Sequence, residues 1–236
     1  MFDQLARTTS RSKTLKKIKA SVDEHSFAHI ISLNTENFVE ATQNADFHTA
    51  YIHAEIVICD GMGISLAGFM LGTPAGERIA GVDCMADIIN AHKDKRIVFV
   101  GGQKDTAQRT FQYFCQTTSQ NNPPWHAIID AQKDDPGLIE QIGRCKPDIL
   151  FLAFGSPFQE LWIENHREQL QGVVCMGVGQ AMDVYGGLVQ RAPKIMRAVG
   201  LEWLFRLYYQ PWRWKRQVRL LQFIHLLIRQ RLWDKA

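Results

Sequence analysis

The stretch AEIVICDGMG, residues 54–63, holds the pattern on which the fold depends. Its apolar run, residues 56–59, shows no polar alternation, which is typical of a strand covered on both faces of a parallel sheet. Asp60 ends the run, and Gly61 and Gly63 mark the turn into a following helix. The stretch therefore predicts a buried strand with a carboxylate at its carboxyl end.

Similar apolar runs recur along the chain and alternate with segments of helical periodicity. Strands are predicted at residues 27–33, 55–59, 96–100, 126–129, 148–154 and 173–178. Helices are predicted at residues 35–44, 62–71, 84–92, 106–117, 137–144 and 159–170. Because strands that alternate with helices build parallel sheets, we expect an α/β protein with a Rossmann-like, mainly parallel sheet and flanking helices.

Residues 191–236 differ from the rest of the chain in charge. They contain eleven Lys and Arg residues and two acidic ones, whereas the remainder has 16 basic and 22 acidic residues. Four of the six tryptophans also fall in this part. We therefore divide the chain into an α/β domain, residues 1–190, and a basic, aromatic C-terminal helical appendage, residues 191–236, with helices predicted at 195–209 and 214–233.

Several classes of protein are disfavoured by what the sequence lacks. The five cysteines are scattered, as in a protein with reduced thiols, and no apolar run approaches the roughly 20 residues that span a bilayer. The start of the chain has no secretory pattern, so we expect a cytoplasmic or peripheral protein. The sequence contains no HExxH or Asp-x-Asp pair for a metal, no Gly-x-Ser-x-Gly elbow and no P-loop.

Polar or glycine-rich segments follow most of the predicted strands, where ligands bind in an open parallel sheet. These segments are residues 32–35, 60–63, 101–103, 155–160 and 177–180. Asp60 at such a strand end is well placed as a general base, but a carboxylate there also serves as a helix N-cap. From the residues alone both interpretations stay open.

Eight segments in order resemble the WecG/TagA/CpsF family of bacterial glycosyltransferases (glycosyltransferase family 26). They are residues 32–34, 54–63, 77–83, 147–150, 155–160, 177–183, 191–193 and 200–207. The resemblance implies an inverting transfer from a UDP-sugar, carrying N-acetylmannosamine, its uronic acid or glucose, to a saccharide on a polyprenyl diphosphate. It implies that Asp60 is the general base, that the UDP-sugar is a substrate, and that no cofactor or metal is needed.

The resemblance also supplies further site residues. Donor and acceptor binding is expected from Ser32, Asn34, Arg78, Gly101, Gln159, Gly177, Gly179, Gln180, Asp183, Arg206 and Arg213. Residues 1–190 would form the catalytic domain, and arginines of the appendage would reach the diphosphate when the appendage closes over bound donor. Gln180 and Met182 depart from the residues that are frequent in the family at these positions.

The appendage also has the composition of a membrane-binding segment. Trp and Tyr favour the headgroup region, and Lys and Arg favour anionic lipid. We expect residues 197–209 to pack on the body and residues 212–233 to contact an anionic membrane at its inner face, with the apolar side chains of Leu220, Phe223, Ile224 and Leu227 in the lipid. The presence of a homo-oligomer is left open.

Two other functions remain as alternatives. A basic aromatic tail also suits an α/β small-molecule sensor or a nucleic-acid-associated regulatory protein, although no helix-turn-helix, RRM or OB pattern accompanies it, and we expect no nucleic-acid partner. A Rossmann oxidoreductase would need an early GxGxxG with an acidic residue about 20 positions later, and the sequence has neither.

Overall fold

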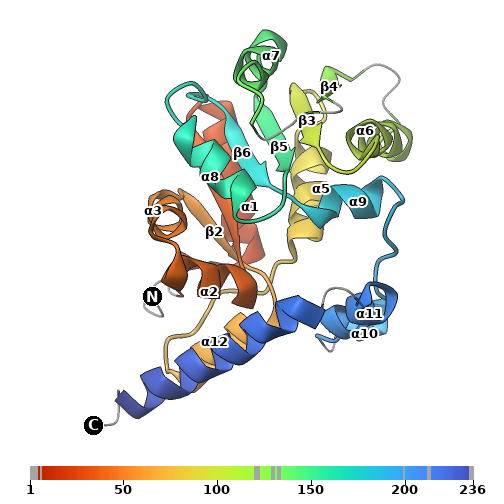
Figure 1. Ribbon diagram of the computed structural model, residues 1–236. Helices are drawn as coiled ribbons and strands as arrows, with labels where there is room; N and C mark the ends of the chain where they lie inside the picture. The colour runs from red at the N-terminus through yellow and green to blue at the C-terminus, as the bar shows by residue number, and fades with distance from the viewer. Residues whose placement is uncertain are drawn as a thin grey trace.

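Six parallel strands form one sheet with helices on both faces, as the computed structural model shows (Figure 1). The structure describes residue 5 and residues 7–119, 123–128, 131, 134–198, 200–211 and 214–233. The strands are β1 (Ala28–Leu33), β2 (Ile56–Cys59), β3 (Ile97–Gly101), β4 (Trp125–Ile128), β5 (Ile149–Ala153) and β6 (Val174–Gly177). All six predicted strands are present, and the α/β fold class is confirmed.

Twelve helices are found within the described residues, more than the sequence pattern predicts. They are α1 (Arg11–Asp23), α2 (Thr35–Gln43), α3 (Ala45–His53), α4 (Met62–Met70), α5 (Gly81–Ala91), α6 (Thr106–Thr117), α7 (Leu138–Cys145), α8 (Phe158–Asn165), α9 (Gln180–Tyr185), α10 (Lys194–Ala198), α11 (Glu202–Tyr209) and α12 (Trp214–Trp233). Helices α1, α3 and α9 are not among the predicted helices. In α1 only Thr14, Ile18 and Val22 are buried, so its apolar stripe is too narrow to stand out among the lysines.

The strands are apolar throughout because both faces of the sheet are covered. Ile30 and Ile58 point into one hydrophobic layer, whereas their neighbours Ile31 and Val57 point into the other. Successive side chains of a strand face opposite sides, so each layer takes every second residue. This explains why the run at residues 56–59 shows no polar alternation.

The strand order β2-β1-β6-β5-β3-β4 places a change of direction in the chain between β1 and β6. The chain leaves β1 toward β2 on one side, and the other four strands are built on the opposite side of β1. In an open parallel sheet, ligands bind at such a change of direction. The loops that follow β1, β2 and β6 are therefore the place to look for the site.

The appendage lies below these loops in Figure 1. One helix was predicted at residues 195–209, but the structure has two, α10 and α11. Gly200 lies between them with a φ of +77°, a backbone conformation that interrupts an α-helix and that glycine adopts without strain. The single-helix prediction is wrong because it overlooked this glycine. Within the described ranges, no helix is both long and apolar enough to cross a bilayer.

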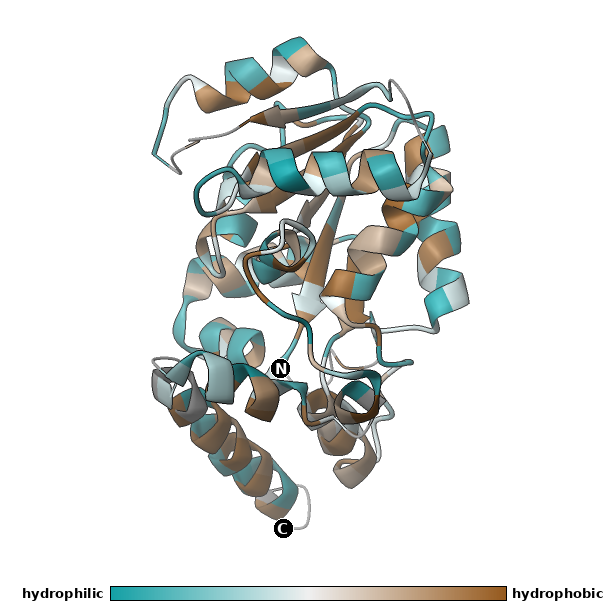
Figure 2. Ribbon diagram, turned by 90° about the vertical axis from the view of Figure 1, so that its right-hand side faces the viewer, coloured by the Kyte–Doolittle hydropathy of each residue, from teal (hydrophilic) through white to brown (hydrophobic). Residues whose placement is uncertain are grey.

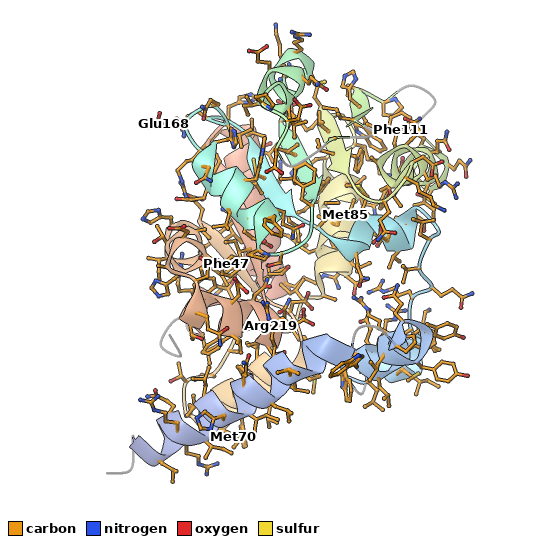
Figure 3. The ribbon with its side chains drawn as sticks, in the orientation of Figure 1. Phe47, Met70, Met85, Phe111, Glu168 and Arg219 are labelled. Atoms are coloured by element: carbon orange, nitrogen blue, oxygen red, sulfur yellow. The ribbon has the colours of Figure 1, made fainter. Side chains whose placement is uncertain are left out.

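The packing of α12 corrects part of the prediction for the appendage: Phe223 and Leu227 are buried, whereas Ile224 is exposed. The α12 helix packs on α2, with Phe223 2% and Leu227 6% exposed and the Phe223 ring 5.2 Å from that of Phe38. Arg219 of α12 forms an ion pair with Glu40 of α2 (2.6 Å), between the two helices in Figure 3. By contrast, none of the side chains of α11, all of which are described, is buried. Phe223 and Leu227 therefore hold α12 on the body and are unavailable to lipid.

Candidate active site

Asp60 directly follows β2 and is held by two hydrogen bonds. Its backbone N–H donates to the carbonyl of Leu33 at the end of β1 (2.8 Å). Its Oδ2 accepts a hydrogen bond from the backbone N–H of Gly81 (3.2 Å), the first residue of α5. The carboxylate therefore lies at the positive end of that helix dipole. These contacts fix the carboxyl group between two strand ends and a helix N-terminus.

Gly81 brings a second polar side chain next to Asp60. A Cβ atom at position 81 would lie 3.1 Å from Ser32 Oγ and 3.4 Å from Asp60 Oδ2. Ser32 belongs to β1, which pairs with β2, so neighbouring strands direct a hydroxyl and a carboxylate toward the same helix end. The absence of a side chain at Gly81 keeps the space between them open.

Burial changes the acidity of Asp60. Desolvation is the largest cause, because protein atoms crowd the carboxyl group although part of the residue reaches solvent, and the net effect raises the pKa of Asp60 to about 6. The Gly81 hydrogen bond and the charges of Arg206 and Arg78 lower this pKa, while Glu202 raises it further. A carboxyl group with this pKa is anionic at neutral pH and is a stronger base than an ordinary aspartate.

Arg78 reaches the site because its segment runs along the edge of β2. Cys59 and Arg78 form an isolated parallel bridge, and the N–H of Ile79 donates to the Cys59 carbonyl (2.7 Å). The guanidinium of Arg78 then donates from Nη2 to the carbonyl of Arg197 in α10 (3.0 Å). Arg78 thus lies near Asp60 and also ties the appendage to the body.

Arg206 brings a second cation to the site from the appendage. It lies on α11 and pairs with Glu202 one turn earlier on the same helix. Its Nη1 donates to Oε1 of Gln180 (3.2 Å), whose Nε2 donates to Oε1 of Gln210 (3.2 Å). Gln180 is the first residue of α9, directly after the β6 loop. Segments that are distant in the sequence therefore meet at Gln180, and the appendage contacts the body there.

Gln159 supports the β6 loop from beneath. Its Oε1 accepts a hydrogen bond from the N–H of Gly179 (3.1 Å), and its Nε2 donates to Glu160 (2.8 Å). Gly177 has no room for a side chain, because a Cβ there would lie 2.6 Å from Gln159 Nε2. Gln159 is 5% exposed, so the structure gives it a supporting position under Gly177 and Gly179. Its expected contact with substrate stays a prediction.

Asn34 has a clear structural role at the end of β1. Its Oδ1 accepts a hydrogen bond from the N–H of Asn37 (2.9 Å), which makes Asn34 the N-cap of α2. Asn37 in turn donates to the Ser32 carbonyl (2.8 Å) and accepts from the Ser156 hydroxyl (2.9 Å). The loops after β1 and β5 are thereby joined. Ligand binding by Asn34 stays a prediction beside this capping role.

Three predicted residues lie outside this group. Gly101 ends β3, four strands away from β2 in the sheet, which at about 4.8 Å per strand corresponds to roughly 19 Å. Asp183 lies on α9, where its carbonyl accepts hydrogen bonds from Leu188 N and Val189 N. Arg213 lies outside the described residues. The structure thus brings together Asp60, Ser32, Arg78, Gln180 and Arg206, and places Gly101 at a distance.

Gly81 and Glu202 belong to the site but are missing from the predicted residues. Each lies inside a segment on which the family resemblance rests, and Glu202 stands four positions before Arg206, a spacing that favours a pair on a helix. That spacing is a signal the sequence analysis could have used. Among the described residues, no group of three or more His, Cys, Asp or Glu side chains is arranged to hold a metal ion.

Comparison with known proteins agrees with this arrangement of segments. A family model described as "Glycosyl transferase WecG/TagA/CpsF family" matches residues 3–236. The chain is similar to the N-acetylglucosaminyldiphosphoundecaprenol N-acetyl-beta-D-mannosaminyltransferase of Bacillus subtilis (strain 168), with 29% identity over 215 residues, which cover 90% of this chain and 83% of that protein. The protein of the same name from Staphylococcus aureus (strain NCTC 8325) is 33% identical over 188 residues, covering 77% and 72%.

Proposed function

The chain belongs to the WecG/TagA/CpsF family of glycosyltransferases, and we propose that it transfers N-acetylmannosamine from a UDP-sugar to N-acetylglucosamine on a polyprenyl diphosphate. The printed names of the relatives support this choice of sugar and acceptor. Membership of a glycosyltransferase family disfavours the regulatory and oxidoreductase alternatives. The observation that carries the proposal is the half-buried Asp60 carboxylate at the carboxyl end of β2, with a raised pKa and two arginines nearby.

In this proposal Asp60 acts as the general base of an inverting transfer. It accepts the proton of the acceptor hydroxyl while the hydroxyl oxygen attacks the anomeric carbon of the donor. The bond from that carbon to the UDP oxygen breaks, and UDP leaves with the electron pair. A base with a pKa of about 6 suits this step, because it is deprotonated at neutral pH yet gains a proton more readily than an exposed aspartate.

The negative charge that develops on the departing diphosphate must be stabilised. Arg206 and Arg78 are the cations that act on Asp60, so both guanidinium groups lie close to the reaction centre. Arg206 is held by Glu202 and Gln180, which keep its planar donors at the interface between appendage and body. We propose that these arginines bind the diphosphate in a metal-independent reaction, since guanidinium groups bind phosphate oxygens through paired hydrogen bonds.

We further propose that the protein works at the inner face of a bacterial plasma membrane, in the synthesis of a surface polysaccharide. A polyprenyl acceptor stays in the bilayer, so a catalytic site for it must approach the lipid surface. The exposed apolar side chains of the appendage, among them Trp203 and Leu221, and its basic residues support association with anionic lipid.

The test is UDP release by the purified protein with a short-chain polyprenyl-diphosphate N-acetylglucosamine acceptor. UDP-N-acetylmannosamine, its uronic acid and UDP-glucose are compared as donors, each with and without acceptor, and with EDTA or added Mg²⁺. We expect acceptor-dependent release with UDP-N-acetylmannosamine that EDTA leaves unchanged and that Asp60→Asn abolishes.

Other outcomes correct particular parts of the proposal. Turnover with another donor alone would replace the sugar but keep the reaction. Loss of activity in EDTA with recovery on Mg²⁺ would overturn metal independence. Full activity of Asp60→Asn would remove Asp60 as the base, and acceptor-independent release alone would contradict a transferase.

A further inference from the structure

Helix α4 exposes an apolar row immediately after Asp60. Met62, Leu66 and Phe69 are 45%, 56% and 83% exposed, and their spacing of four and three residues places them on one face of the helix. The segment from residue 61 to residue 76 contains no charged residue. Met62 lies against Gly200 of the appendage, which leaves Leu66 and Phe69 as the most exposed part of the row. The outer face of a surface helix normally carries polar residues, so this exposed part indicates an interaction site.

The inner face of α4 lies against α12. Ile64 and Ala67 belong to the same buried cluster as Phe223 and Leu227, and Met70 packs against its border. Gly63 lies next to the Phe223 ring, since a Cβ there would be 4.0 Å from that ring. In Figure 3, Met70 is labelled at the lower end of the molecule beside α12. The two helices are therefore neighbours at the end of the molecule that carries the appendage.

Helix α12 is apolar on two opposite sides. Phe223 and Leu227 face the body, while Leu221, Ile228 and Leu232 repeat at intervals of seven and four residues on the outer side and are 67%, 52% and 66% exposed. Arg229 and Arg231, which flank this outer stripe, are exposed as well. Figure 2 shows brown, hydrophobic residues along the helices at this lower end, and Figure 1 places α4 and α12 there together.

We infer that α4 inserts its apolar row into an anionic bilayer and, with the outer stripe of α12, seats the carboxyl ends of the strands on the membrane. The role assigned to this contact, presenting a lipid-linked acceptor to Asp60, rests on the proposed function. The occupant is lipid because the α4 row is uncharged and the adjoining helix is basic, which matches acyl chains beneath anionic headgroups.

A second copy of the chain fits this surface less well. In a two-fold contact the same patch faces itself, so the arginines that border the outer stripe of α12 would approach their own copies. Like charges that meet across an interface oppose association. Anionic lipid headgroups instead neutralise these arginines while the apolar rows enter the bilayer.

The position of α4 sets the distance between the catalytic group and the lipid. Exposure rises from Met62 to Phe69, so the end of the helix farthest from Asp60 projects the most. Helix α4 rises about 10 Å from Met62 to Phe69 at 1.5 Å per residue, and Gly61 joins Met62 to Asp60. The two chain steps from Met62 to Asp60 add at most about 7 Å, so insertion of Phe69 holds Asp60 within about 18 Å of the apolar layer.

The experiment measures flotation of the full chain with vesicles of phosphatidylcholine and phosphatidylglycerol, with no substrate present. We expect the double variant Leu66→Ser/Phe69→Ser to bind about 100-fold more weakly than the wild type, since each of the two buried apolar side chains contributes about a tenfold factor. Phe69→Trp should keep the binding. Ile52→Ser, which changes an exposed apolar residue (38%) on α3, is the matched control and should float like the wild type.

Activity provides a second measurement. We expect the double variant to lose turnover of a long-chain acceptor in these vesicles but to keep turnover of a short-chain acceptor in solution. If no acceptor is turned over by any variant, the proposed function fails, and the flotation result still decides the role of α4. Unchanged flotation of the double variant would overturn the inference. A shift from dimer to monomer in sedimentation, with vesicle binding intact, would instead assign the α4 row to a contact between copies.

Discussion

Carboxyl groups at the two ends of the parallel strands have pKa values shifted in opposite directions. We call the side where the strands begin the amino edge of the sheet and the side where they end the carboxyl edge. At the amino edge, Asp148 precedes β5 and accepts hydrogen bonds from the backbone N–H (2.8 Å) and the guanidinium (2.8 Å) of Arg96, which precedes β3. Burial alone would raise the pKa of Asp148, but these bonds hold it below its usual value. At the carboxyl edge, Asp60 accepts one backbone hydrogen bond from Gly81, and its pKa is raised.

Glu164 shows the same pattern at the amino edge. It contacts Nδ1 of His53 (2.7 Å) and Nε of Arg167 (3.3 Å), and Arg167 also pairs with Glu55 (2.7 Å). Although burial opposes it, the pKa of Glu164 falls to about 2. His29 Nδ1 lies 3.9 Å away, too far for a hydrogen bond. Asp148 and Glu164 at the amino edge thus stabilise the fold through paired contacts, whereas Asp60 at the carboxyl edge, the proposed base, has a raised pKa.

The variant Asp60→Asn is expected to show the largest difference in function between the two edges. We expect kcat to fall by about 10³-fold, within the range for loss of a general base. The folded-state pKa of about 6 exceeds the ordinary 3.8, so folding is disfavoured progressively as pH rises between these values. The neutral amide removes that cost, and we expect a free energy of unfolding about 1–3 kcal/mol higher at pH 8. UDP release measures the fall in kcat, and urea denaturation measures the free energy of unfolding. A variant that loses activity because it is less stable than the wild type would contradict the assignment of Asp60 to function.

Arg206→Ala tests the cation that the appendage adds to the carboxyl edge. We expect kcat/KM to fall by about 10- to 100-fold, because the variant loses a charge-assisted contact with the diphosphate. Arg206→Lys should recover part of the activity, since it keeps the charge but not the planar pair of donors. Arg144→Ala, at an exposed position on α7, is the control. If Arg206→Ala and the control variant have equal activity, Arg206 has no role in the site.

Asp148→Ala tests the amino edge. The variant leaves the Arg96 N–H without its side-chain acceptor at a nearly buried position, and we expect the free energy of unfolding to fall by about 1–3 kcal/mol. Specific activity of the folded protein should stay within twofold. Glu140→Ala removes one partner of an exposed pair and should change neither quantity. A loss of activity without a loss of stability would reverse the assignment.

The smallest expected effect is the difference between the pH dependence of activity, set by Asp60, and that of stability, to which Glu164 contributes. In the proposed mechanism Asp60 must be deprotonated, so activity should fall about tenfold per unit as pH drops below about 6. The stabilisation from Glu164 is present above its ordinary pKa of 4.5 and is lost only as pH falls toward about 2. Between pH 5 and 6 the protein should therefore be folded but less active. Because Glu202 raises the pKa of Asp60, Glu202→Gln should move the activity midpoint a few tenths of a unit lower; a shift upward would contradict this arrangement.

The strands were predictable from the sequence because burial on both faces leaves a continuous apolar run that few other structures produce. The packing of α12 was not. Its inner residues, Phe223 and Leu227, and its outer residues, such as Leu221 and Ile228, are equally apolar, so periodicity cannot tell which side meets the body. That choice depends on Phe38 and Glu40 of α2, which are distant in the sequence.

The residues of the site were predictable from the sequence, but the contacts among them were not. Asp60 stands out because it lies between an apolar strand and a Gly-x-Gly turn, and the family resemblance supplied Arg78, Gln180 and Arg206. The contacts among them join segments from different parts of the chain. Gly81, for example, approaches Asp60 only because α5 begins beside the end of β2. No local pattern in the sequence encodes that approach.

The tight space around Gly81 has a consequence for the evolution of this protein. The methyl group of alanine would lie tightly against Ser32 Oγ, at 3.1 Å, and would occupy the space beside the Asp60 carboxylate, at 3.4 Å. Substitution of Gly81 is therefore disfavoured, because any side chain would fill the space between the Ser32 hydroxyl and the Asp60 carboxylate. The exposed residues later in α5, such as Asn90, are under no such restriction. We expect amino-acid substitutions to accumulate far more slowly at Gly81 than at the exposed residues of α5. Selection would then dominate at one end of the helix and neutral substitution on its outer face.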